Sequence, residues 1–187
     1  MISAQEVLDL LAERGALRSG HFLLSSGNHS DTYVEKARIL EDPAIVTRLA
    51  EEIGSWFEGV DTVASPAVGA IPLGFAVAQQ LTARFVYAER TDDRLLFRRG
   101  FSFRKGERTL VVEDVITTGG SVGELLGLVR EVGADPIGVA ALIDRSVGDP
   151  SFHLRALARV EANVFRPESC PLCDQELPLE SPGSRHG

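Results

Sequence analysis

One stretch of this sequence decides its fold: Thr109-Leu110-Val111-Val112-Glu113-Asp114-Val115-Ile116-Thr117-Thr118-Gly119-Gly120-Ser121-Val122. Its apolar, β-branched beginning predicts a strand that is buried on both faces. Two adjacent carboxylates follow at the carboxyl end of that strand, and hydroxyl residues and glycines then lead into a helical pattern. A strand, an acidic pair, a small-residue turn and a helix in this order predict a site for an anion.

The chemistry of this turn favours a phosphate group. A turn of small residues presents backbone N–H groups, and Gly119 and Gly120 let the backbone approach a ligand closely. The dipole of the following helix favours negative charge at the same place. Glu113 and Asp114 would repel a phosphate, but they suit ribose hydroxyls or a hydrated Mg²⁺ beside it. The alternative is an ordinary strand-to-helix turn with a capping hydroxyl.

The segment from Val111 to Ser121 resembles the phosphoribosyl pyrophosphate (PRPP) motif of type I phosphoribosyltransferases. The resemblance implies that Glu113 and Asp114 hold the ribose hydroxyls and that the following loop holds the 5-phosphate. The PRPP-binding residues that it implies are Glu113, Asp114, Val115, Ile116, Thr117, Thr118, Gly119, Gly120 and Ser121. It also implies the fold of that family, a central parallel sheet flanked by helices, with a small N-terminal hood and a flexible β-arm.

Length and composition are those of an ordinary globular protein. The chain has 187 residues, of which 44% are hydrophobic and 25% charged, so a single domain is expected. We divide it into a hood over about residues 1–40, a core over about 60–145 and a loosely ordered tail over about 167–187. The net charge of −8 argues against a general nucleic-acid binder. No membrane span or secretion signal is evident, and two cysteines make no disulfide framework, so we expect a cytoplasmic protein.

Helical and extended patterns alternate along the chain, which predicts an α/β protein whose ligands bind at the carboxyl ends of parallel strands. Ser3 with Glu6 forms a capping box before the first helix, and Asp42-Pro43 opens another. The predicted strands are 22–24, 33–37, 60–64, 85–88, 110–112, 137–143 and a late one near 157–164, with an alternating segment over 97–103. Loops that begin near Ser65, Glu113 and Asp144 all follow strands.

A second resemblance lies near the N-terminus. The pattern Phe22-x-Leu24-x-Ser26-Gly27-x-x-Ser30-x-x-Tyr33 is similar to a segment of orotate phosphoribosyltransferases that forms a hood over the base. His21 and His29 lie in the same region. We interpret them as loop histidines, because neither a cysteine nor a suitably spaced carboxylate nearby completes a set of metal ligands.

The turn after the strand near Val60 is identified, by the same resemblance, as the pyrophosphate loop. It includes Ala67, Val68 and Gly69, and the family often has a cis peptide at the position of Ala67-Val68. Many orotate enzymes carry Tyr-Lys-Gly in this loop, where this chain has Val68-Gly69-Ala70. One lysine contact to the substrate is therefore missing.

Basic residues concentrate between Arg90 and Lys105 in an otherwise acidic chain. One interpretation is a solvated charged hairpin, and the other is an electropositive lid for pyrophosphate. The resemblance implies a flexible loop here that reaches the active site of the neighbouring subunit. Arg90 matches the start of its basic pair, and its Lys-x-His element is absent. Arg98 and Arg99 are the candidates to replace it, so the predicted catalytic residues are Arg90, Arg98 and Arg99.

Asp144-Arg145 follows the strand predicted at 137–143. The resemblance assigns Arg145 to the binding of the orotate carboxylate, and it implies that Thr117 also contacts orotate. The alternative is a surface ion pair between Asp144 and Arg145.

Cys170-Pro171-Leu172-Cys173 is half of a zinc site, and the chain has no second pair of cysteines. A two-fold dimer could supply the other half, but we favour incidental thiols. The segment from Pro182 to Arg185 resembles the tail of one bacterial branch of the orotate enzymes.

Together the resemblances imply the transfer of phosphoribose from PRPP to N1 of orotate in UMP synthesis. They imply Mg²⁺ carried by PRPP, with no metal bound directly by the protein, and a homodimer without nucleic-acid or membrane partners. Two alternatives remain: a phosphoribosyltransferase for another base, and a PRPP-binding regulator that kept the fold and lost the chemistry.

Overall fold

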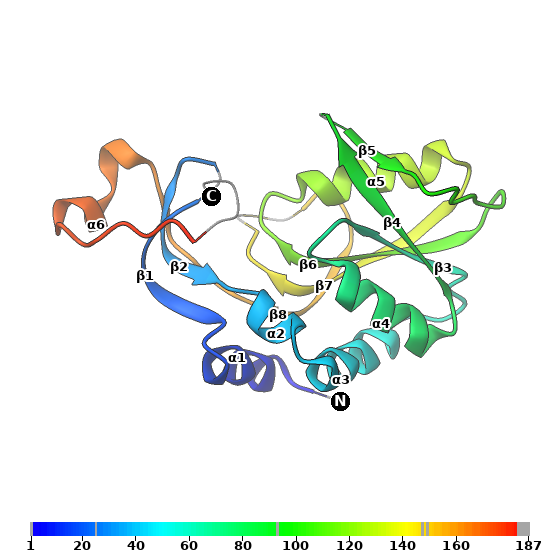
Figure 1. The fold of residues 1–187 in the computed structure, drawn as a ribbon, viewed down its shortest axis with the longest axis horizontal. Coiled ribbons are helices and arrows are strands. Elements are labelled where there is room, and N and C mark those ends of the chain that lie inside the picture. Colours follow the sequence, from blue (N-terminus) through cyan, green and yellow to red (C-terminus); the bar gives the residue numbers. More distant parts are fainter. Residues whose placement is uncertain (1, 25, 93, 147, 149, 183–187) are drawn as a thin grey trace.

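We describe the chain in a computed structural model that covers residues 2–24, 26–92, 94–146, 148 and 150–182 (Figure 1). The helices are α1 (Ala4–Glu13), α2 (Ala37–Leu40), α3 (Pro43–Gly54), α4 (Ile71–Leu81), α5 (Gly120–Glu131), the 3-10 turn η1 (Pro167–Ser169) and α6 (Pro171–Asp174). The strands are β1 (Leu17–Leu23), β2 (His29–Val34), β3 (Thr62–Pro66), β4 (Arg84–Thr91), β5 (Arg94–Phe97), β6 (Arg108–Ile116), β7 (Asp135–Asp144), β8 (Leu154–Arg159) and β9 (Val164–Phe165).

The central sheet has the strand order β5-β4-β3-β6-β7-β8. All neighbours pair in parallel except β5, which runs antiparallel to β4 at the edge. Leu110, Val111 and Val112 of β6 are 0% exposed, because helices cover both faces of a parallel sheet. This confirms the predicted fold class and the doubly buried strand.

Two hydrophobic clusters form the core. Figure 1 shows α3 and α4 on one side of the sheet and α5 on the other. The first includes Leu49 of α3 and Leu73 of α4, and the second includes Leu125 and Val129 of α5. Apolar residues recur at helical spacing in these helices and so form one apolar face on each helix. The burial of that face is therefore expected from the sequence pattern. The sheet is thus fixed from both sides, and its carboxyl-end loops project from a rigid support.

The helix starts predicted from capping residues are confirmed. The Ser3 hydroxyl accepts a hydrogen bond from the Glu6 backbone N–H, and the Glu6 carboxylate accepts one from Ser3 N at 2.7 Å. Asp42 caps α3 through the backbone N–H groups of Ala44 and Ile45. These bonds satisfy donors that a helix start would otherwise leave unpaired.

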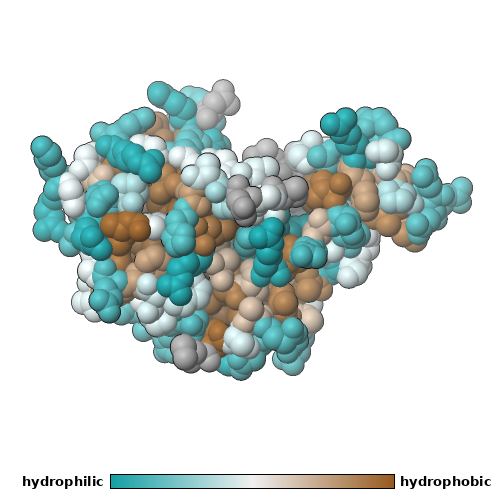
Figure 2. Space-filling model, turned by 180° about the vertical axis from the view of Figure 1, so that it is seen from behind, coloured by the Kyte–Doolittle hydropathy of each residue, from teal (hydrophilic) through white to brown (hydrophobic). Residues whose placement is uncertain are grey.

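The hood is a small antiparallel sheet of order β1-β2-β9. Its third strand comes from near the C-terminus, and residue Glu180 adds a bridge to Phe22 of β1. Figure 2 shows this lobe projecting from the main body, with hydrophilic side chains at its outer end. The prediction of a loosely ordered tail is therefore wrong for residues 167–180, which pack against the hood, whereas Pro182 to Arg185 lies almost wholly outside the described residues.

Three other predictions of extended structure are corrected. The second hood strand spans His29–Val34 rather than 33–37, because the chain turns into α2 at Ala37. The late strand spans Leu154–Arg159 rather than 157–164. Of the alternating segment 97–103, only Phe97 belongs to a strand.

Aromatic packing explains the last correction. Phe97, Phe101 and Phe103 all pack against the cluster that includes α5, and the rings of Phe97 and Phe103 lie 4.7 Å apart. Gly100, with φ of 74°, turns the chain between them. The two-stranded arm consists of β4 and β5. The alternating aromatic residues after β5 hold an irregular loop against the core.

Among the residues that the structure describes, none of the helices combines the length and the hydropathy that a bilayer crossing requires.

Candidate active site

Three loops meet at one edge of the sheet, at the carboxyl ends of β3, β6 and β7. These strands are neighbours in the order β3-β6-β7 and run in parallel, so their carboxyl ends lie together. The backbone N–H of Arg145 donates to the carbonyl of Ile116 at 2.7 Å, which joins the last two loops directly. The sequence analysis placed its candidate residues for PRPP, pyrophosphate and orotate on these three loops, and the fold brings the loops together.

The acidic pair lies in the last part of β6. Asp114 is 2% exposed, and its Oδ2 atom lies 2.6 Å from Nζ of Lys36. The backbone N–H of Val115 donates to Asp114 Oδ1 at 2.6 Å, and that of Asp114 donates to Glu113 Oε1 at 2.9 Å. A buried carboxylate needs such partners to remain charged.

Glu113 is in a different electrostatic state. Burial first, and then the neighbouring charge of Asp114, raise the pKa of Glu113 to about 8. Two adjacent carboxylates in a poorly solvated place separate in this way because like charges oppose a second ionisation. Asp114 is therefore paired with a lysine, whereas its neighbour Glu113 has a raised pKa that favours its protonated form.

Lys36 is a site residue that the sequence analysis missed. It begins the short helix α2, with its side chain 41% exposed, and no motif marks it. A Cβ atom on Gly69 would lie 2.3 Å from Asp114 Oδ2 and 2.6 Å from Lys36 Nζ. The Lys36–Asp114 pair therefore lies directly against the loop whose own lysine is missing.

That loop connects β3 to α4, and it includes Ala67, Val68 and Gly69. The Ala67-Val68 peptide is cis, as the resemblance implied. The Val68 side chain is 77% exposed, and the backbone N–H of Ala67 donates to the carbonyl of Ala88 at 2.8 Å. The base of the loop is thus tied to β4, and its tip faces outward.

The turn after β6 has the features of an anion-binding turn. Gly119 directly precedes the first turn of α5 and has φ of 73°. A residue with a side chain would adopt this backbone angle only with strain. A Cβ atom there would also lie 3.0 Å from the Phe152 ring. Thr117 and Thr118 are exposed, and Thr118 Oγ1 accepts a hydrogen bond from Gly120 N at 3.4 Å. The exposed hydroxyls and the N-terminus of α5, which has no side-chain cap, closely follow the acidic pair in the chain.

Arg145 points into the hood. Its Nη2 atom donates to the Thr32 carbonyl at 3.0 Å and lies 3.5 Å from Ser30 Oγ. Its Nε–H is buried and has no hydrogen-bond partner among the described residues. Burial lowers the pKa of Arg145, although guanidinium stays charged at any physiological pH. The result is a half-buried cation with an unused donor.

The predicted alternative, an ion pair between Asp144 and Arg145, is wrong. Asp144 Oδ2 lies 3.4 Å from Arg159 Nη1, and Asp144 Oδ1 accepts hydrogen bonds from the backbone and hydroxyl of Ser146. The two side chains of the dipeptide therefore have different partners, and Arg145 remains available for a ligand.

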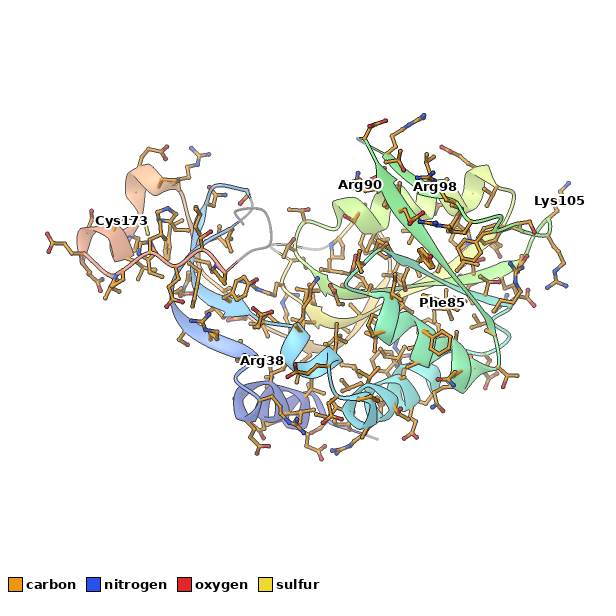
Figure 3. The ribbon with its side chains drawn as sticks, viewed as in Figure 1. Arg38, Phe85, Arg90, Arg98, Lys105 and Cys173 are labelled. Carbon is orange, nitrogen blue, oxygen red and sulfur yellow. The ribbon has the colours of Figure 1, made fainter. Side chains whose placement is uncertain are left out.

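Of the three predicted catalytic arginines, Arg90 lies in β4 of the arm, and Arg98 and Arg99 directly follow β5. Arg90 pairs with Glu124 of α5 at 2.8 Å, and Arg99 pairs with Glu89 of β4 at 2.9 Å. Figure 3 shows Arg90 and Arg98 on the arm and Cys173 at the hood. Their catalytic role and the mobility of the arm stay predictions.

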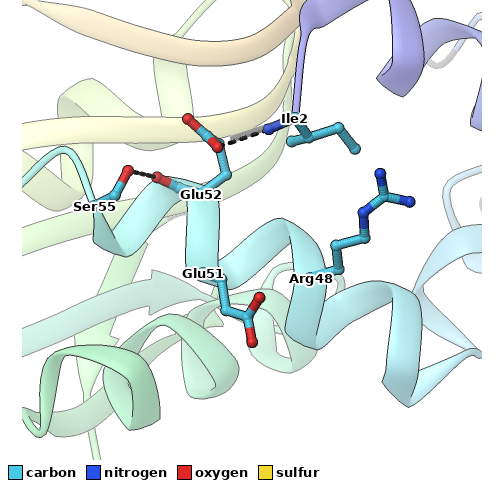
Figure 4. Close-up of a pocket in the computed structure, with 5 residues that line it drawn as sticks. All are labelled: Ile2, Arg48, Glu51, Glu52 and Ser55. Atoms are coloured by element: carbon cyan, nitrogen blue, oxygen red, sulfur yellow. Dashed lines mark hydrogen bonds between the residues drawn. The ribbon is translucent and has the colours of Figure 1, made fainter.

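A separate pocket lies between the N-terminus and α3. Ile2, Arg48, Glu51, Glu52 and Ser55 line it. Figure 4 shows Ile2 N donating to Glu52 Oε2 and the Ser55 hydroxyl donating to the Glu52 carbonyl. It shares no residue with the three loops, so we do not assign it to the candidate site.

The hood contains a second group of polar side chains, made of His21, His29, Cys170 and Cys173. Their ligand atoms all lie within 4.8 Å of one another. The prediction of loop histidines without a cysteine nearby is wrong: His21 lies in β1, His29 lies in β2, and both are buried beside the two cysteines.

The oxygen donors of the acidic pair suit one cofactor. Mg²⁺ accepts carboxylates as ligands. It usually keeps several water ligands and also coordinates phosphate oxygens of the substrate. Lys36 already neutralises Asp114. Glu113, the less buried of the two acids, is therefore the residue that would hold the water shell of a Mg²⁺ arriving with a diphosphate.

Comparison with known proteins places the chain in a family. It matches the phosphoribosyl transferase domain family over residues 35–151. It is 43% identical to the orotate phosphoribosyltransferase of Desulforamulus reducens, with 98% of each chain covered. It is 44% identical to that of Thermotoga petrophila, with 96% of this chain and 98% of the relative covered.

Solved structures agree with this placement. The orotate phosphoribosyltransferase of Aeropyrum pernix has a TM-score of 0.67 and 26% identity, over 82% of this chain and 93% of that one. The UMP synthase of Leishmania donovani shares the fold, with a TM-score of 0.71 and 21% identity over 94% of this chain and 39% of that one. By identity over nearly its whole length, the chain belongs to the orotate phosphoribosyltransferase family.

Proposed function

We propose that this chain transfers the 5-phosphoribosyl group of PRPP to N1 of orotate, releasing pyrophosphate and forming orotidine 5′-monophosphate for UMP synthesis. The observation that carries the proposal is the position of Arg145. This half-buried cation is joined through its backbone to the end of β6 and through its side chain to the hood. An anionic base between the hood and the β6 turn would meet it.

On the PRPP side, the turn from Thr117 to Ser121 would bind the 5-phosphate through backbone N–H groups and hydroxyls. Glu113 and Asp114 would accept hydrogen bonds from the ribose hydroxyls. A protonated Glu113 can also donate to one of them. These roles rest on the open N-terminus of α5 and on the position of both acids in the same strand, β6.

On the orotate side, Arg145 would bind the carboxylate of the base. Its Nε–H has no protein partner among the described residues, and a carboxylate is the acceptor that a guanidinium engages most strongly. Thr117, at the start of the neighbouring turn, would contact the same base.

Lys36 would serve the pyrophosphate. Its ammonium group lies against Gly69 of the pyrophosphate loop of Ala67, Val68 and Gly69. With 41% of its side chain exposed, it can turn from Asp114 toward an incoming phosphate. We propose that Lys36 supplies the contact that a loop lysine supplies in other orotate enzymes.

The reaction breaks the bond between ribose C1 and a pyrophosphate oxygen and forms the bond from C1 to N1 of orotate, whose N1 proton is released to solvent. Positive charge then grows on the ribose, as in other glycosyl transfers. A bound Mg²⁺ would neutralise the leaving pyrophosphate. The chain's own residues would hold the two anionic substrates in line, and Arg90, Arg98 and Arg99 would add positive charge as the arm closes.

Turnover of a panel of bases tests the proposal. Orotate, uracil, hypoxanthine and adenine are each incubated with PRPP and Mg²⁺, with wild-type protein, Arg145→Ala and the exposed control Arg130→Ala. We expect turnover of orotate alone. Arg145→Ala should lower kcat/KM for orotate by about 100-fold, because a buried charge pair across an interface is lost. PRPP binding should be unchanged, and Arg130→Ala should behave as wild type.

Other results would separate the alternatives. Turnover of a purine would show another base specificity. PRPP binding without turnover of any base would support a regulator. Full activity of Arg98→Ala/Arg99→Ala would exclude the two arginines as replacements for the missing basic loop residues.

A further inference from the structure

We propose that His21, His29, Cys170 and Cys173 form a tetrahedral zinc site that fastens the C-terminal segment to the hood. The four side chains come from β1, β2, the end of η1 and α6. Nothing in the phosphoribosyl transfer chemistry uses them. Two imidazoles and two thiols converging from segments far apart in the sequence form a complete ligand set for zinc.

The distances between the ligand atoms suit a zinc ion at their centre. The sulfur of Cys170 lies 3.6 Å from His21 Nε2, and that of Cys173 lies 3.7 Å from the same atom and 3.3 Å from His29 Nδ1. The two ring nitrogens lie 2.9 Å apart. Tetrahedral zinc with ordinary bond lengths separates a nitrogen from a sulfur by about 3.5 Å and two nitrogens by about 3.3 Å.

The second nitrogen of His21 has the partner that a ligating histidine needs. His21 Nδ1 lies 2.9 Å from the carbonyl of Leu177. A proton on Nδ1 donated to that carbonyl leaves the lone pair of Nε2 directed at the cysteines, and such outer hydrogen bonds fix the tautomer of metal-bound histidines. The ligand atoms are therefore His21 Nε2, His29 Nδ1 and the two sulfurs.

Burial and local fold also suit a structural metal. His21, His29 and Cys170 are 3%, 6% and 1% exposed. Among the residues of β1, β2 and β9, only Phe22 and Val34 are buried apolar side chains. The hood sheet has a third strand of only two residues. Small lobes with little core commonly need a metal or a disulfide. Cys170 and Cys173 lie at opposite ends of one helical turn. This Cys-x-x-Cys spacing commonly supplies two of the four ligands of a zinc site.

Zinc fits this set better than other metals. A tetrahedral set of two sulfurs and two nitrogens is typical of zinc. A Rieske iron–sulfur cluster also uses two cysteines and two histidines, but on two separate irons, which would hold sulfur and nitrogen farther apart than the 3.3–3.7 Å seen here. Binding through two thiols would release about two protons, because the ligands are thiolates. A dimer-bridging metal, the possibility raised by the lone cysteine pair, is unnecessary, since one chain completes the set.

The site connects to catalysis through β2. His29 begins that strand, and the next residues, Ser30 and Thr32, contact the Arg145 side chain. A metal that fixes His29 therefore fixes the acceptors that orient Arg145. We expect loss of the metal to weaken orotate binding more than PRPP binding.

Metal content of the full-length protein is the first test. Wild type, Cys173→Ser, His29→Asn and the control His153→Ala, a histidine on the exposed surface, are purified under a non-thiol reductant with zinc present and then dialysed. Mass spectrometry should find about one zinc per chain in wild type and in His153→Ala. Each ligand variant should retain less than about a tenth of that amount.

Cobalt and chelator experiments keep the proposal testable if the ligand variants fold poorly. Wild type loaded with Co²⁺ should show the visible spectrum of tetrahedral cobalt with thiolate ligands. Removal of zinc from wild type by a chelator should lower Tm, raise KM for orotate several-fold and leave KM for PRPP nearly unchanged, and added zinc should reverse both changes.

Wild type that binds no zinc at micromolar concentrations in the reduced state would overturn the proposal. An octahedral cobalt spectrum, or zinc retained equally by Cys173→Ser and His29→Asn, would overturn it as well. None of these results depends on which base the enzyme uses.

Discussion

At the residue scale, the main finding is that two neighbouring carboxylates lie in different electrostatic surroundings. Asp114 is buried and paired with Lys36, whereas burial and Asp114 together raise the pKa of Glu113 to about 8. In the sequence the two acids look equivalent. Lys36, the residue before α2, contacts Asp114 directly, whereas burial of Glu113 outweighs the weaker attraction of that lysine.

The raised pKa of Glu113 predicts how stability depends on pH. The folded protein holds a proton on Glu113 up to about pH 8, whereas the unfolded chain loses it near 4.5. Between these values the folded state binds more protons, so the free energy of unfolding falls as pH rises. Glu113→Gln removes this effect. The Tm of Glu113→Gln minus the Tm of wild type should therefore become more positive from pH 5 to pH 9.

Thermal unfolding of wild type, Glu113→Gln and the exposed control Glu13→Gln at several pH values measures the effect. A constant Tm difference between Glu113→Gln and wild type across this range would show that Glu113 ionises normally in the folded state.

Lys36 permits a test that separates a structural role from a role in substrate binding. Lys36→Met should leave Asp114 buried without its cation and lower the free energy of unfolding by about 1–3 kcal/mol. Lys36→Met/Asp114→Asn should recover part of that stability, because no buried charge remains. If Lys36 contacts pyrophosphate, KM for PRPP should stay raised by about 10-fold or more in Lys36→Met, a loss of roughly 1.4 kcal/mol.

Denaturant unfolding and steady-state kinetics on Lys36→Met, Asp114→Asn and the double variant check this prediction. An unchanged KM for PRPP in Lys36→Met would limit Lys36 to holding Asp114.

At the element scale, the pyrophosphate loop depends on the absence of a side chain at Gly69. A Cβ atom there would lie 2.3 Å from Asp114 Oδ2 and 2.6 Å from Lys36 Nζ. Gly69→Ala must therefore displace the loop or separate the Lys36–Asp114 pair. We expect kcat/KM for PRPP to fall by about 100-fold, since small displacements of positioned groups carry costs of this size.

Gly123→Ala is the matched control for this substitution. Gly123 lies in α5, and nothing lies within 4 Å of a Cβ atom there. Alanine in a helix interior should stabilise the protein by about 0.5–1 kcal/mol with unchanged kinetics. Equal kinetic effects of the two substitutions would contradict the role assigned to the loop.

The arm shows where an element-scale prediction from pattern was wrong. Alternating aromatic residues over 97–103 indicated a strand, and only Phe97 is in one. Both a strand and an irregular loop can bury every second residue when an apolar surface lies beside them. The surface in this case is provided by α5 and its neighbours, which a local pattern cannot reveal.

At the scale of the whole molecule, the resemblance implies a dimer in which the arm of one subunit completes the site of the other. Arg145→Ala removes the base site and Arg98→Ala/Arg99→Ala removes the arm cations, so each variant alone should be nearly inactive. Mixed dimers with arms acting in trans contain one intact site. A mixture in equal amounts should recover roughly a quarter of wild-type activity, as two-fold symmetry requires.

Activity measured after co-refolding of the two variants, with each variant refolded alone as a control, tests this prediction. Recovery no greater than the sum of the two separate activities would mean that each arm serves its own subunit, or that the protein works as a monomer.

Much of the fold and part of the site could be read from local pattern. The β6 strand, its turn and α5 were predicted from one stretch because apolar β-branched residues, glycines and a helical period each restrict the backbone locally. The caps at Ser3 and Asp42 were read in the same way. The family resemblance then supplied the residues of the three loops and the cis peptide at Ala67-Val68.

By itself, the sequence determined the α/β class, the order of the elements and the edge of the sheet that carries the site, because burial periodicity and parallel connections leave few other solutions. Only the tertiary structure decided the partners of Lys36, Arg145 and the hood histidines. Arg145 contacts Thr32, which is 113 residues away in the sequence, and Cys170 contacts His21, which is 149 residues away. Contacts of this range depend on how the hood packs on the core and how the tail returns to it, and no local pattern encodes that packing.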